Sequence, residues 1–240
     1  MSRARAVVFD VDFTLIYPGP VFRGEGYQAF SKRYGILVDP AKFEAAVASA
    51  SSLLNEDIGG SEYDDEIFVT YTRHIIEQMG GKDSGTDASL DACAREIYGE
   101  WARSHHFEMY DDVPEVLREL TSAGLKIGLI SNSHRPLDEF QSHFELREFI
   151  SAAVSSADHG AMKPHPSIFM AALEQLNVAA ADAVMVGDSL RQDVEGALGV
   201  GMRAVWLHRG DSAAPHSLAL HDTAIPVIRS LHELVQLVIE

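Results

Sequence analysis

The sequence has little cysteine, few basic residues and no long apolar run, and each shortage excludes a class of protein. Its one cysteine, Cys93, can form no internal disulfide, so the fold is not a disulfide scaffold. Lysine and arginine number 19 against 36 acidic residues, and the formal charge of −17 argues against nucleic acid or a membrane surface as a partner. No stretch reaches the roughly 20 apolar residues of a membrane span, and the polar start at 1–5 predicts no signal peptide. We therefore expect a cytoplasmic protein, either a monomer or a homodimer.

The chain of 240 residues is 46% hydrophobic, enough for a sizeable core. Residues 18–106 carry apolar residues at helical spacing and no convincing strand. After Phe107, apolar runs alternate with helical patterns, which is typical of βαβ units and a parallel sheet. The expected strands are Leu125–Ile130, Ile150–Ser155, Ala183–Val186, Ala204–Leu207 and Ala224–Ile228, and 212–217 is expected to be a surface loop. The prediction is an α/β fold with a doubly wound parallel sheet in a core domain of residues 1–17 and 107–240, and an inserted all-helical domain at 18–106.

The chain is organised around a short buried strand at its start, Ala6 to Phe9, which runs into Asp10 and Asp12. Side chains two residues apart on an extended segment share a face, so both carboxylates are expected to project from the carboxyl edge of the sheet, where ligands bind. Two adjacent like charges recruit a cation or shift each other's titration. An aspartate turn or a helix cap is the alternative. A calcium loop is excluded, because Leu15 and Val21 stand where it needs glycine and glutamate.

Three later strand ends bring polar residues to the same edge. Ser131 and Asn132 follow one strand, and small donors beside a helix start suit an anion. Lys163, one of only five lysines, follows the next strand in a proline-rich loop. Asp188 and Asp193 follow a third. Taken singly, these residues also fit a helix cap, a solvated lysine and an acidic turn, but together they predict a phosphate-binding and metal-binding site.

In this order the motifs resemble those of the haloacid dehalogenase (HAD) superfamily, in the branch that carries a helical cap after the first motif. The motifs are Asp10-Val11-Asp12-Phe13-Thr14, Ser131-Asn132, Lys163-Pro164, and Gly187-Asp188 with Asp193. The resemblance covers nearly the whole chain. It implies a Rossmann-like core domain, a C1-type cap domain and a phosphatase-like hydrolase that works through an aspartyl-phosphate.

The resemblance also implies roles for single residues. Asp10 would attack phosphorus, and Asp12 would protonate the leaving oxygen and then activate water. Ser131 and Lys163 would hold the phosphoryl oxygens, with Thr14 and Asn132 in the same phosphate-binding set. Mg²⁺ would sit on Asp10, the backbone carbonyl of Asp12 and Asp188, with Asp193 in support. The expected substrate is a small phosphorylated metabolite.

Three other functions are weighed against phosphatase activity. The family's 2-haloacid dehalogenases lack the second aspartate of the first motif, so Asp12 disfavours that reaction. A phosphonate-cleaving enzyme would need a cap lysine, and those of residues 18–106 look solvated. A catalytically idle binding or regulatory protein would keep the fold, but no motif residue is missing here.

Five residues near the motifs carry separate expectations. Phe13 stands where many relatives have glycine, which puts the size of the admitted substrate in question. His134-Arg135 and His208-Arg209 follow predicted strand ends, and each pair is expected either to touch substrate or to lie on the surface.

Overall fold

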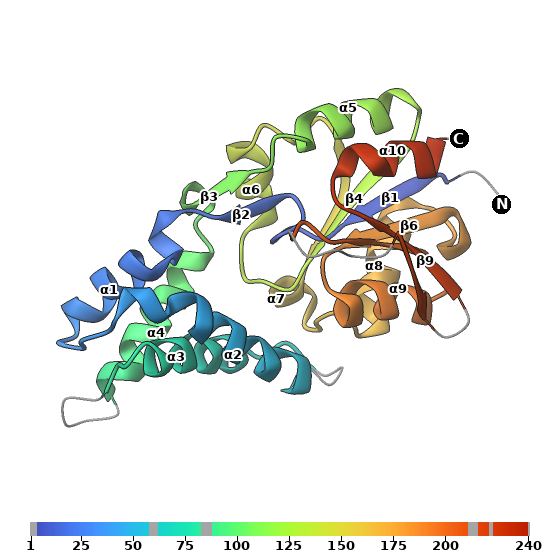
Figure 1. Ribbon diagram of the computed structural model, residues 1–240. Helices are drawn as coiled ribbons and strands as arrows, with labels where there is room; N and C mark the ends of the chain where they lie inside the picture. Colours follow the sequence, from blue (N-terminus) through green and yellow to red (C-terminus); the bar gives the residue numbers. More distant parts are fainter. Residues whose placement is uncertain (1–3, 58–61, 83–87, 211–215, 221–222, 240) are drawn as a thin grey trace. The chain divides into compact units, whose positions relative to one another are not determined.

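A computed structural model describes residues 4–57, 62–82, 88–210, 216–220 and 223–239. The chain divides into two compact units, one formed by residues 1–17 and 109–240 and the other by residues 18–108. Each unit is described separately below (Figure 1).

The first unit contains a seven-stranded sheet in the order β5-β4-β1-β6-β7-β9-β8. The strands are β1 (Ala6–Phe9), β4 (Lys126–Ser131), β5 (Ile150–Ser155), β6 (Ala183–Gly187), β7 (Arg203–Leu207), β8 (Ser217–Leu220) and β9 (Thr223–Ile228). All neighbouring pairs are parallel except β8 and β9, which are antiparallel. The predicted doubly wound α/β fold is confirmed, with β8 as an unpredicted edge strand whose first residue falls at the end of the expected loop. Residues 212–215 of that loop lie outside the described residues.

Helices cover both faces of this sheet. They are α5 (Val113–Ser122), α6 (Leu137–His143), α7 (Ser156–His159), α8 (Pro166–Leu176), α9 (Gly196–Gly199) and α10 (Leu231–Ile239), with short 3₁₀ and π turns at η4 (Ala180–Asp182) and η5 (Leu190–Glu195). In Figure 1, α5 and α10 lie over one face, and α8 and α9 lie over the other. The buried core between the sheet and α8 includes Val8, Met185 and Phe169.

The central position of β1 fixes where the site forms. Ala6 to Phe9 are fully buried, and they pair in register with β4 on one side and β6 on the other. Because both faces and both edges of β1 are occupied, an apolar run without polar alternation suits it. The carboxyl ends of β1, β4 and β6 therefore meet at one edge, which carries the first, second and fourth motifs.

The second unit is built from helices. They are α1 (Gly24–Arg33), α2 (Phe43–Asp57), α3 (Asp65–Gln78) and α4 (Ala88–Trp101), with 3₁₀ turns at η1 (Pro20–Phe22), η2 (Pro40–Lys42) and η3 (Ser104–His106). α3 packs against both α2 and α4, and the thiol of Cys93 is buried. A two-stranded sheet of β2 (Ile16–Pro18) and β3 (Phe107–Met109), unpredicted from the sequence, stands where the chain passes between the units. No helix in the described part of the chain is both long and apolar enough to span a bilayer.

Candidate active site

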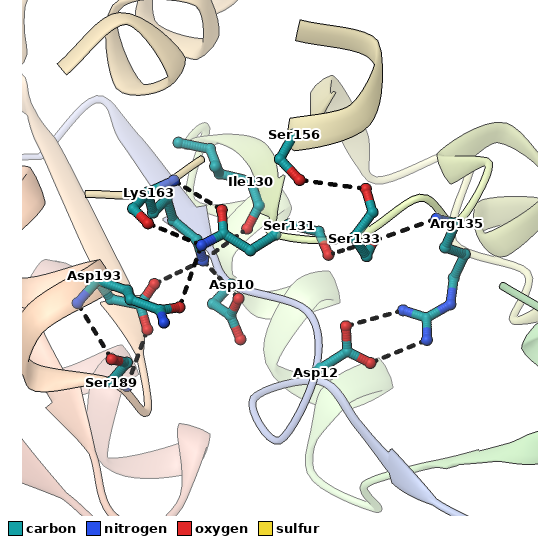
Figure 2. Close-up of polar contacts among 12 residues, drawn as sticks. Asp10, Asp12, Ile130, Ser131, Ser133, Arg135, Ser156, Lys163, Ser189 and Asp193 are labelled. Atoms are coloured by element: carbon teal, nitrogen blue, oxygen red, sulfur yellow. Dashed lines mark hydrogen bonds and ion pairs between the residues drawn. The ribbon is translucent and has the colours of Figure 1, made fainter. Parts of the chain in front are cut away.

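Asp10 follows β1 directly, and its backbone N–H donates to the carbonyl of Val186 at 2.9 Å. One carboxylate oxygen, Oδ1, accepts a 2.6 Å hydrogen bond from Nζ of Lys163 (Figure 2). The other oxygen, Oδ2, is buried and has no hydrogen-bond partner among the described residues. A buried carboxylate oxygen without a hydrogen-bond donor lowers the stability of the folded protein. The Oδ2 atom of Asp10 is therefore suited to contact a bound ligand.

Lys163 is held by a set of fixed acceptors. Its Nζ lies 2.6 Å from Oδ1 of Asp193 as well, and it donates to the carbonyl of Ile130 at 3.1 Å. Its backbone is clamped by the side chain of Asn132, which accepts from the Lys163 N–H at 2.7 Å and donates to its carbonyl at 2.9 Å. Asn132 therefore positions the lysine loop, whereas the sequence placed it in the phosphate-binding set.

Asp193 reaches Lys163 because the backbone at the end of β6 has no side chain in the way. A Cβ added at Gly187 would lie 2.2 Å from Oδ2 of Asp193. That oxygen accepts from the backbone N–H of Ser189 at 3.0 Å, so both carboxylate oxygens of Asp193 already have donors. Asp193 lies on the π turn η5, where helical spacing brings its side chain back to the strand end.

The carboxylate oxygens of Asp10, Asp188 and Asp193 all lie within 4.8 Å of one another. Burial raises the pKa of Asp10 to about 7, against the opposing effect of Lys163. Desolvation by the surrounding protein raises the pKa of Asp188, and the negative charges of Asp10 and Asp193 raise it further. Burial works against the charge of Lys163, but the two carboxylates outweigh it and raise its pKa.

Three acidic groups with one lysine leave an excess of negative charge, which a divalent cation would offset. The carboxylates of Asp10 and Asp188 offer the hard oxygen ligands that Mg²⁺ prefers. The residues present therefore fit a magnesium ion. Asp193 fits less directly, because its oxygens are already engaged.

Asp12 lies apart from this cluster. Its two carboxylate oxygens accept hydrogen bonds of 3.0 and 3.1 Å from the guanidinium of Arg135. Figure 2 shows the carboxylate of Asp12 directed toward Arg135, away from Lys163. The structure thus brings together Asp10, Lys163, Asp188 and Asp193, and it places Asp12 beside them with its carboxylate in a separate ion pair.

The remaining predicted phosphate ligands are both fully buried. Ser131 ends β4, and its hydroxyl pairs with that of Ser133 at 2.9 Å. Thr14 has a hydroxyl without a partner among the described residues, and its carbonyl accepts from Arg209 at 3.0 Å. No hydrogen bond in the described part of the chain joins Thr14 to the acidic cluster.

The surface alternative for the two arginines was wrong. Arg135 is fully buried and forms an ion pair with Asp12. Arg209 makes a bidentate pair with Asp112 at 2.9 and 3.0 Å, and its guanidinium lies 3.8 Å from the ring centre of Tyr110. A local sequence signal could not reveal either pair, because the partners are far apart along the chain. His134 and His208 are half-buried.

Phe13 adopts a left-handed backbone conformation with φ of 64°, and its side chain is 45% exposed. A non-glycine residue rarely adopts this conformation, whereas glycine adopts it without strain. The aromatic ring therefore belongs to the surface beside Asp12 and not to the core.

Comparisons with known proteins bear on this arrangement. A family model described as haloacid dehalogenase-like hydrolase matches residues 4–201. A haloacid dehalogenase-like hydrolase domain-containing protein 3 from Danio rerio is 31% identical over 96% of this chain and 94% of its own. A glyceraldehyde 3-phosphate phosphatase from Pyrococcus furiosus is 34% identical over 98% of this chain and 93% of its own. The crystal structure of a HAD phosphatase from Thermococcus onnurineus, 28% identical, covers 97% of both chains with a TM-score of 0.64.

Proposed function

This chain belongs to the haloacid dehalogenase-like hydrolases, and we propose that it hydrolyses a small phosphomonoester through an aspartyl-phosphate formed on Asp10. The proposal rests on the hydrogen bonding of the two carboxylate oxygens of Asp10. One of its oxygens is held by Lys163, and the other is buried without a partner among the described residues. Such a carboxylate is oriented and has one oxygen available for attack.

In the first step, Oδ2 of Asp10 forms a bond to phosphorus while the bond from phosphorus to the ester oxygen breaks. Asp12 gives a proton to that departing oxygen, so an alcohol leaves. Lys163 offsets the charge of the phosphoryl group, and it donates to one of its oxygens by giving up one of its three present acceptors. The hydroxyl of Ser131 donates to another phosphoryl oxygen.

In the second step, Asp12 takes a proton from a water molecule, which attacks phosphorus. The bond between phosphorus and Asp10 breaks, and inorganic phosphate leaves with Asp10 restored. Because Asp12 serves as acid and then as base, its protonation state at the end equals that at the start. Its presence favours ester hydrolysis over dehalogenation, in which no departing alcohol needs a proton.

Asp10, Asp188 and the backbone carbonyl of Asp12 would hold Mg²⁺, with Asp193 fixing Lys163 beside them. When bound, the ion neutralises phosphoryl charge so that a carboxylate can approach a dianion. The raised pKa values of Asp10 and Asp188 support this assignment, because protonation relieves the same excess of charge that a cation would.

The helical unit, residues 18–108, is proposed to be the cap domain that selects the substrate. The glyceraldehyde 3-phosphate phosphatase among the relatives supports a small phosphorylated metabolite as the class. Such a substrate is freely diffusing, which agrees with an enzyme of the cytoplasm that needs neither membrane nor nucleic acid.

The test is phosphate release from a panel of phosphorylated metabolites and an aryl phosphate, with Mg²⁺ and with a chelator. We expect activity that requires Mg²⁺ and disappears in Asp10→Asn. A folded protein that releases no phosphate from any member of the panel would support the idle binding protein instead. Halide release from a 2-haloacid would support the dehalogenase.

A further inference from the structure

Arg135 is a fully buried arginine whose guanidinium makes two parallel hydrogen bonds to one carboxylate, that of Asp12. We propose that Arg135 is a positioning residue that acts through Asp12, holding this carboxylate in one orientation from which it is released to serve the leaving group. This inference rests on the proposed function, because it gives Asp12 the acid and base roles.

The geometry of the pair sets how firmly Asp12 is held. Arg135 Nη1 lies 3.1 Å from Oδ2 and Nη2 lies 3.0 Å from Oδ1, so both carboxylate oxygens are engaged by one planar fork. A bidentate pair fixes the plane of the carboxylate as well as its distance, which a lysine at the same place could not do. The side chain of Asp12 is 18% exposed and that of Arg135 is 0% exposed, so a buried guanidinium anchors a carboxylate that solvent can still reach.

The held orientation is the one from which Asp12 turns toward the leaving group, and without Arg135 the carboxylate takes other rotamers and reaches the leaving oxygen less often. Figure 2 shows the Asp12 carboxylate turned toward Arg135 and away from Asp10. To pass a proton to an ester oxygen bound at Asp10, an oxygen of Asp12 must give up its bond to the guanidinium. Arg135 therefore defines the starting position of each proton transfer.

The loop that carries Arg135 also carries the proposed phosphate donor. The backbone N–H of Arg135 donates to Oγ of Ser133 at 3.4 Å, and that oxygen lies 2.9 Å from Oγ of Ser131. Phosphate binding at Ser131 and the hold on Asp12 thus share one short segment between β4 and α6. This connection gives the segment a means of releasing Asp12 when the phosphoryl group is in place.

A purely structural arginine would give a different result from a positioning one, and the chain offers a matched control. Arg209 makes a second bidentate pair in the same unit, with Asp112 at 2.9 and 3.0 Å, and Asp112 is not a motif residue. Removing Arg209 deletes the same kind of ion pair and leaves the hydrogen bonds of Asp12 in place; it also removes the hydrogen bond to the carbonyl of Thr14, which does not depend on the leaving group.

The experiment is a double-mutant cycle with Arg135→Gln, Asp12→Ala and both together. The readout is the rate of alcohol release in the first turnover, measured with aryl and alkyl phosphates whose leaving groups differ in pKa. We expect Arg135→Gln to slow poor leaving groups on the order of 10²-fold, the effect of a misplaced catalytic group, and to change good ones little. The substrate concentration for half-maximal rate should change little, and in the Asp12→Ala background the Gln substitution should have no further effect.

The control variant, Arg209→Gln, should add its effect to that of Asp12→Ala and act equally on all leaving groups. If Arg135→Gln behaves in that additive and uniform way, the inference is overturned. If Arg135→Gln fails to fold, Arg135→Lys is tested instead, because lysine keeps the positive charge but cannot make the two parallel hydrogen bonds. We expect Arg135→Lys to show the same dependence on the leaving group. A loss that is equal for all leaving groups would overturn the inference. An inactive wild-type protein would contradict the proposed function, whereas an active one with additive variants would contradict only this inference.

Discussion

Nζ of Lys163 lies 2.6 Å from Oδ1 of Asp10, and the second oxygen of that carboxylate has no hydrogen-bond partner among the described residues. The lysine thus orients the aspartate and leaves one oxygen available. It also shares its charge with Asp193, again at 2.6 Å. The chemistry of the site and the stability of the sheet edge therefore depend on the same buried ion pairs.

Asp10→Asn is expected to remove activity by at least about 10³-fold, because an amide cannot serve as the nucleophile. Phosphate release under saturating Mg²⁺ measures the loss, and circular dichroism verifies the fold. A variant that kept more than a few per cent of wild-type activity would contradict covalent catalysis at Asp10.

Lys163→Met is expected to lower both activity and stability. The substitution leaves the buried carboxylates of Asp10 and Asp193 without their cation, and breaking a buried pair costs about 3–5 kcal/mol in the free energy of unfolding. Chemical denaturation measures that change. Lys126→Met is the control, because Lys126 donates to the carbonyl of Leu176 and faces no carboxylate among its described contacts; we expect about 1 kcal/mol or less. Equal losses in the two variants would contradict the central role of Lys163.

Gly187→Ala is expected to damage the site, because its Cβ would lie 2.2 Å from Oδ2 of Asp193. Asp193 must then move, which withdraws an acceptor from Lys163. Activity should fall together with the melting temperature. Gly199→Ala is the matched control, since an added Cβ there meets nothing within 4 Å, and it should behave as wild type.

The protein without metal is expected to lose stability as the pH rises from about 4 to about 7. Burial raises the pKa of Asp10 from 3.8 to about 7, so in this window the folded state holds a proton that the unfolded chain has lost. Stability falls with rising pH wherever the folded state binds more protons. The melting temperature should therefore fall more steeply with pH in the wild type than in Asp10→Asn.

Added Mg²⁺ should raise the wild-type melting temperature more at pH 8 than at pH 5.5, because protons compete with the cation for the same carboxylates. Equal shifts at both pH values would contradict a cation bound to Asp10.

Strand ends made most of the site predictable. Asp10 and Asp188 come at the ends of the neighbouring strands β1 and β6, and Lys163 follows β5 after the short helix α7. Their meeting at one edge is expected of a parallel sheet, in which ligands bind at the carboxyl ends of the strands. The edge strand β8 was missed, because Ser217–Leu220 carries only a short, half-buried apolar pattern beside a polar stretch.

The pairs made by Arg135 and Arg209 could not be predicted in the same way. Each joins residues about a hundred positions apart, and no periodicity marks either partner. Asp112 resembles the start of a capping box, yet its side chain makes no cap bond to α5 and accepts from Arg209 and from the backbone N–H of Leu231. The local sequence pattern at Asp112 favours a helix cap, whereas the structure gives its side chain tertiary partners instead.

Phe13 is expected to govern which substrates enter, because it directly follows Asp12 in the chain and its side chain is 45% exposed. Phe13→Gly and Phe13→Ala both remove the ring, so both should alter KM across phosphomonoesters of increasing size and change kcat little. Their stabilities should differ. Glycine adopts the left-handed conformation without strain, which should raise the free energy of unfolding by roughly 1–2 kcal/mol. This gain offsets the roughly 0.5–1 kcal/mol by which glycine lowers it through the greater flexibility of the unfolded chain. Alanine keeps the strain, so Phe13→Ala should melt below Phe13→Gly, the reverse of the usual order of these two residues. A KM that stayed constant across the size series in both variants would place the ring outside the path of the substrate.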